Sequence, residues 1–126
     1  METVNIYVAW IGMFVGALVG ALSGLFFHEQ EWLGGYTSWQ RRMIRLGHIS
    51  FFGIAFINIA FVFTVSYLNI ERGIILPSRL LIIGAITMPL VCFLSAYKKF
   101  YKHFFFIPVL SILGAMALFV IGEVIL

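Results

Sequence analysis

The chain has 126 residues, of which 63% are hydrophobic and 10% are charged, and its mean hydropathy is +1.09. These values exclude a soluble domain and indicate a protein that needs lipid around it. The net charge of +3 does not indicate nucleic-acid binding, because the basic residues stand at the edges of apolar stretches, where membrane topology places them. The single cysteine, Cys92, excludes an internal disulfide, a Cys-rich zinc site and a C-x-x-C-H haem attachment.

Four apolar stretches predict an all-α integral membrane protein. We expect a single domain, residues 1–126, that forms a four-transmembrane-helix bundle with helices at 4–27, 45–70, 76–97 and 102–126. A helix of roughly 20 residues crosses about 30 Å of hydrocarbon, which matches each of these stretches. The stretches are continuous and do not alternate, so they do not have the pattern of a β-barrel.

The first predicted helix combines an acidic start with a glycine repeat. Because it starts with Glu2 and exceeds the 7 to 15 apolar residues typical of a signal-peptide core, we expect it to stay in the mature protein. Residues four apart share one helix face, so the repeat predicts a bare groove that another helix approaches closely. A flat porphyrin or quinone ring in the groove is the alternative. The repeat consists of Gly12, Gly16, Gly20 and Gly24.

The second and third predicted helices contain residues that need partners inside the membrane. Ser38 is an expected N-cap for a basic turn that leads into the second helix. Asn58 lies about 15 Å along the second helix from His48, near mid-membrane, and we expect it to hydrogen-bond across helices. In the third helix, Pro89 predicts a kink that frees the carbonyl of Ala85, with Thr87 as a neighbouring donor.

The basic residues predict the orientation of the bundle. Lys and Arg accumulate in cytoplasmic loops, and the first and third loops are richer in them than the second. We therefore expect both termini on the outer side, and a bacterial inner membrane as the location. The residues that carry this prediction are Arg41, Arg42, Arg45, Lys98, Lys99 and Lys102, against Arg72 and Arg79 in the second loop.

The three histidines, His28, His48 and His103, all fall at the expected cytoplasmic edge. His48 and His103 each follow a cation of their own helix by about one turn, which predicts a similar depth. Two imidazoles on facing helices would ligate one b-type haem, with Arg45, Lys99 or Arg42 near its propionates and His28 as a replacement or supporting group. The alternative is that topology alone gathers these residues at the interface.

These features favour a small membrane subunit of a respiratory or related electron-transfer complex. Haem b between His48 and His103 would carry the electrons, with a quinone nearby, and the expected partners are other membrane subunits and lipids. The sequence indicates no catalytic residue, since Glu123 is the only carboxylate inside a predicted helix. Whether the chain takes part in an enzyme stays open. Two alternatives remain, a purely structural subunit whose glycine face docks a larger protein, and a small oligomeric transporter or channel.

Overall fold

The computed structural model describes residues 2–125 and the side chains of residues 3–123, and it is helical with no strand in that range. Four segments are long and apolar enough to cross a membrane, which confirms the prediction of four apolar helices. The elements are α1 (Glu2–Phe27), η1 (Trp32–Gly34), α2 (Trp39–Tyr67), α3 (Ile75–Tyr97), η2 (Lys99–Phe104), α4 (Phe106–Val120) and η3 (Ile121–Ile125), of which η1 and η2 are 3-10 helices and η3 is π-helical.

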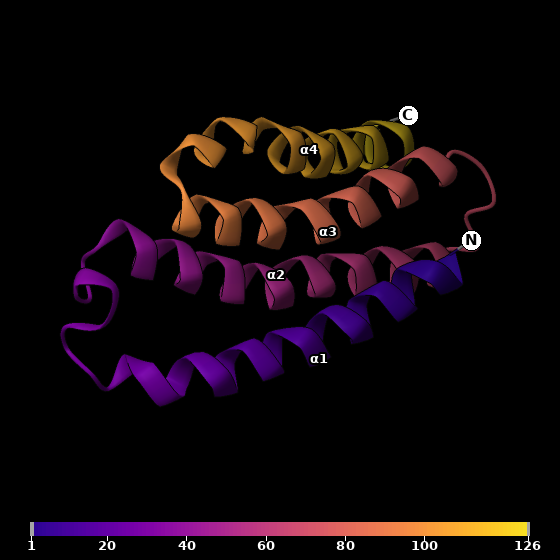
Figure 1. The fold of residues 1–126 in the computed structure, drawn as a ribbon. Coiled ribbons are helices and arrows are strands. Elements are labelled where there is room, and N and C mark those ends of the chain that lie inside the picture. Colours follow the sequence, from indigo (N-terminus) through magenta and orange to yellow (C-terminus); the bar gives the residue numbers. More distant parts are fainter. Residues whose placement is uncertain (1, 126) are drawn as a thin grey trace.

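The four long helices run up and down, and each packs against the next along the chain (Figure 1). α2 and α3 form the centre, α1 covers α2 and also contacts α3, and α4 packs against α3. The beginning of α1 and the end of α4 therefore lie at one end of the bundle, and the α1–α2 and α3–α4 links lie at the other. Which end faces the cytoplasm stays a prediction.

The starts of two helices differ most from the sequence-based expectation. α2 begins at Trp39, six residues before position 45, because the Ser38 hydroxyl accepts a hydrogen bond from the backbone N–H of Arg41 at 3.2 Å. The basic turn is thus the first part of α2. The fourth span opens as the 3-10 helix η2 and becomes α-helical only at Phe106. Pro108 fits there because the first N–H groups of a helix have no intrahelical acceptor.

α3 continues through Pro89 without ending. The hydroxyl of Thr87 donates to the carbonyl of Ile83 at 2.7 Å, and not to that of Ala85, the carbonyl that Pro89 deprives of its N–H donor. Ala85 and Pro89 instead line a groove between α1 and α3.

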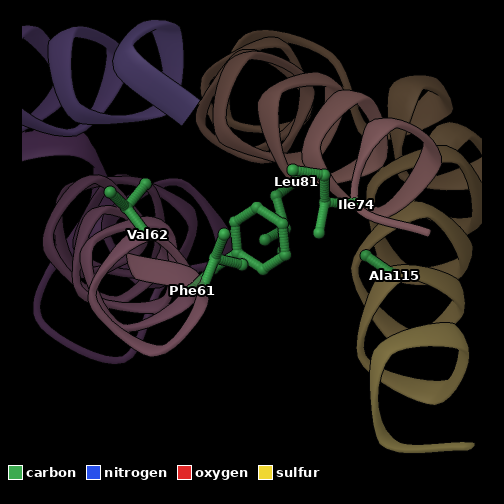
Figure 2. Packing of buried hydrophobic residues seen from close by; sticks show 6 residues of the cluster. Phe61, Val62, Ile74, Leu81 and Ala115 are labelled. Carbon is green, nitrogen blue, oxygen red and sulfur yellow. The ribbon is translucent and has the colours of Figure 1, made fainter. Parts of the chain in front are cut away.

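The main apolar core joins α2, α3 and α4 near the end where α1 begins. Phe61 of α2 projects toward Leu81 of α3 and Ile74, and Ala115 of α4 closes the cluster (Figure 2). α1 contributes much less to the interior, since 11% of an 18-residue apolar window of α1 is buried, against 39% of the corresponding window of α2. Most of the α1 surface is therefore not covered by the rest of the bundle.

Candidate functional site

The glycine groove of α1 is filled by α2 of the same chain. A Cβ added at Gly16 would lie 2.7 Å from the Cβ of Phe51, and one added at Gly12 would lie 3.7 Å from the Phe51 carbonyl oxygen. At Gly20 the nearest atom is Nε2 of His48, while Gly24 has nothing within 4 Å. The two helices are thus in close contact at Gly16 and separate toward Gly24. The groove takes up an intramolecular helix, so it is not free for a larger protein or a flat ring.

His48 is half-buried and its ring is directed at α1. Its Nε2 lies 2.5 Å from the position of a Cβ at Gly20, and its ring meets Phe52 edge-on at 5.4 Å between centroids. A metal bound to Nε2 would lie about 2 Å beyond that nitrogen. The α1 backbone already occupies this space, so this arrangement does not fit haem ligation by Nε2 of His48.

The other two histidines lie elsewhere at the same end of the molecule. His103 is exposed in η2, with its ring 5.9 Å from that of Phe100, and η2 packs against α3. His28 is exposed just after α1. Nothing in the contacts brings the three imidazoles around a common ligand, and residues 2–125 hold no group of three or more His, Cys, Asp or Glu side chains suited to a metal. A haem between His48 and His103 stays a prediction that these positions do not support.

The cations expected beside haem propionates have other neighbours. Arg45 lies over the ring of Tyr36 at 4.1 Å and donates to the Tyr36 carbonyl at 2.9 Å. Arg42 and Lys99 both lie over the ring of Trp39. These three side chains organise the basic end of the bundle itself.

Arg41 is the buried cation of this end, with 3% of its surface exposed. Its guanidinium donates to the carbonyl of Phe27 at 3.3 Å and to that of Glu29, and it lies over the rings of Phe27 and Trp32 at 5.3 and 5.5 Å. A cation at the carboxyl end of a helix satisfies free carbonyls and opposes the negative end of the helix dipole. Arg41 therefore caps α1 and fixes the link to α2. From the sequence, Arg41 contributes only to the predicted orientation of the bundle, and its capping role was not predicted.

A polar network joins three helices inside the apolar region. The side-chain amide of Asn5 in α1 donates to Oδ1 of Asn58 in α2 at 2.7 Å and to the carbonyl of Ser78 in α3 at 3.2 Å. The Ser78 hydroxyl donates back to Asn5, and Asn58 also donates to the carbonyl of Ile54 at 3.0 Å. Asn5 and Asn58 are fully buried. The expectation of a bonded Asn58 is confirmed, whereas Asn5 and Ser78 were not predicted, although a polar residue inside an apolar stretch is itself a signal of a required partner.

An apolar groove of about 450 Å³ lies between α1 and α3, with Phe51 of α2 at its base. A quinone ring needs donors for its carbonyl oxygens, and the side chains that line the groove offer none. The groove suits hydrocarbon, either an acyl chain or the side chains of another helix. Its α1 and α3 walls are Val8, Ile11, Gly12, Val15, Ala85, Ile86, Pro89, Leu90 and Phe93.

Comparison of the chain with models of known protein families, with curated proteins and with solved structures found no match. The class that the fold defines is therefore an all-helical bundle with four helices able to span a membrane.

Proposed function

We propose that this chain is a non-catalytic subunit of a membrane complex and that the outer face of α1 packs against a helix of a partner subunit. The observation that carries the proposal is the position of Trp10. Its side chain is 64% exposed, and it lies seven residues, or about 10 Å, inside the span that begins at Thr3. Tryptophan at the surface of a membrane protein prefers the headgroup level, where its N–H finds an acceptor.

The indole N–H of Trp10 has no acceptor within the part of the chain that the structure describes, whereas that of Trp39 donates to the Ser95 carbonyl at 2.8 Å. An unpaired donor in hydrocarbon is costly, and a partner helix that offers a carbonyl or side-chain oxygen removes that cost.

The surface around Trp10 has the shape of a helix-packing face. Tyr7, Trp10 and Phe14 are each about two-thirds exposed and recur at three- and four-residue spacing, so they form a ridge along α1. The apolar groove between α1 and α3 runs beside this ridge. Helices pack by inserting ridges into grooves, so a partner helix would meet both features at once.

That the complex is a respiratory or related electron-transfer assembly is a separate proposal. It rests on the abundant aromatic residues of the sequence and on the glycine-rich first helix. An absorption spectrum of the complex purified in mild detergent tests it, since a bound haem gives a Soret band. A transport role has less support, because Asn58, the polar group expected near mid-membrane, is bonded to Asn5 and Ile54.

Site-specific photo-crosslinking in native membranes tests the packing face. A photoreactive phenylalanine at position 10 or 14 should give a discrete protein adduct, the same one from both positions. The matched control is Leu113 of α4, which is 58% exposed on another helix and should give no such adduct. Adducts with lipid alone at positions 10 and 14 would refute the proposal.

A further inference from the structure

One end of the bundle concentrates the positive charge of the protein. Six of the eight basic residues lie in or beside the α1–α2 and α3–α4 links, together with two of the five acidic residues. Two of these cations are already engaged, Arg41 with the carbonyls that end α1 and Arg45 with Tyr36. Arg42 and Lys99 are among the four cations that remain at this end.

Arg42 and Lys99 come from different elements and meet at one aromatic ring. The Arg42 guanidinium carbon lies 5.7 Å from the centre of the Trp39 ring, and the Lys99 ammonium nitrogen lies 5.4 Å from it. Trp39 is itself fixed, because its N–H donates to the carbonyl of Ser95 in the last turn of α3. The Trp39 ring therefore has a cation of α2 and a cation of η2 within 6 Å of its centre.

Both of these cations keep their donors free. Their side chains are exposed, and within residues 3–123 no carboxylate pairs with them and no hydrogen bond uses them. An anion that lies beside the Trp39 ring would be attracted by both positive charges. A phosphodiester has two non-bridging oxygens that share one negative charge and can accept hydrogen bonds from an arginine and a lysine.

We propose that Arg42 and Lys99 bind the phosphodiester of an anionic phospholipid, whose headgroup lies beside Trp39. The position favours a lipid over an acidic protein segment, because the site stands where the apolar spans of α2 and α3 end, at headgroup depth. An apolar groove of about 240 Å³ between α3 and the η2–α4 segment could take up an acyl chain at the same end, since Leu94 and Tyr101 line it. This site is separate from the α1 packing face.

The test measures lipid binding to the purified protein in an uncharged detergent, by native mass spectrometry. Phosphatidylglycerol is titrated against the protein, with phosphatidylcholine as the zwitterionic lipid and inorganic phosphate as the free anion. The test variant is Arg42→Gln/Lys99→Gln. The control variant, Lys98→Gln/Lys102→Gln, removes the same charge from the same end but not from the Trp39 ring. Thermal unfolding of both variants in detergent checks that each is folded.

We expect the Arg42→Gln/Lys99→Gln variant to bind phosphatidylglycerol about 5- to 30-fold more weakly than the unmodified protein, which corresponds to about 1 to 2 kcal/mol for the loss of two exposed ion pairs with the phosphodiester. The control variant should lose less than about threefold, because a micelle of uncharged detergent has no surface potential of its own. Equal losses in the two variants, or equal binding of phosphatidylcholine, would overturn the proposal. So would full competition by millimolar inorganic phosphate, which would indicate a site for the free anion.

Discussion

Replacing Asn5 by leucine tests whether the buried polar network holds α1 to the rest of the bundle. The substitution keeps the branched shape and the number of side-chain heavy atoms but removes three hydrogen bonds, two donated by Asn5 to Asn58 and to the Ser78 carbonyl and one accepted from the Ser78 hydroxyl. Side-chain hydrogen bonds between membrane helices contribute about 0.6 kcal/mol each on average, so the lost bonds account for roughly 2 kcal/mol. The Asn58 carbonyl oxygen is then left unpaired in a buried position, which adds about 1 kcal/mol or more.

The expected decrease in the free energy of unfolding is therefore about 2 to 4 kcal/mol. It can be measured by titrating sodium dodecyl sulfate into mixed micelles and following the loss of helicity by circular dichroism. The matched control is Ser111→Ala, because the Ser111 hydroxyl donates to the Ile107 carbonyl of its own helix and links no two helices. This control should change the unfolding free energy by less than about 0.5 kcal/mol.

A double-mutant cycle separates the network from the individual side chains. In the Asn5→Leu/Asn58→Leu variant neither residue leaves the other unpaired, so the combined loss should fall short of the sum of the single losses by about 1 kcal/mol or more. Additive losses would show that the two residues do not interact. An Asn5→Leu protein as stable as the unmodified one would refute the reasoning, since leucine would then pack as well as the hydrogen-bonded amide.

Three further predictions concern the α1–α2 contact and the basic end. Gly16→Ala should lower the free energy of unfolding by about 1 to 3 kcal/mol in the same titration, because its added carbon meets Phe51 Cβ, which cannot move without its backbone. Gly24→Ala is the control and should lower it little, since a Cβ there meets nothing within 4 Å. Equal losses in the two variants would refute the close contact. Arg41→Met should lower the free energy of unfolding by about 2 kcal/mol or more and speed proteolysis of the link after α1, because the carbonyls of Phe27 and Glu29 lose their charged donor. Unchanged cleavage would contradict the capping role. His48→Ala should leave the absorption spectrum of the purified complex unchanged, and loss of a Soret band in this variant would show that His48 ligates haem after all.

The number and length of the spans could be predicted because both depend on hydropathy along the chain. α3 was expected to begin at residue 76 and begins at Ile75, since Arg79 near one end and Lys98 at the other mark the limits of an apolar block. The expected start of α2 at residue 45 is too late, because the basic first turns of this helix lack the apolar residues by which a span is recognised. The Ser38 cap, which could be recognised from the sequence, was the better indicator of where that helix begins.

The direction of each histidine could not be predicted, because it depends on which helices are neighbours. A period of 100° per residue places His48 on a face of its own helix but does not say which helix that face meets. In the structure that face meets Gly20 of α1, and His103 lies in η2, which packs against α3. The equal depth of His48 and His103 along the membrane normal stays a prediction, and a shared ligand also requires a lateral arrangement that only the fold determines.

Side-chain donors have different roles at different places in this protein. Asn5 and Asn58 satisfy each other inside the bundle, so they hold the fold and need nothing from outside. Trp10 presents its donor on the exposed surface of a helix able to span a membrane, and in the proposal above a partner segment supplies the acceptor. Arg42 and Lys99 present theirs at the end of the spans, where phosphate is the abundant acceptor. If depth decides the kind of partner, Trp10→Phe should weaken the complex and leave phosphatidylglycerol binding intact. The Arg42→Gln/Lys99→Gln variant should do the reverse, and a variant that disturbs both properties equally would show that one surface serves both.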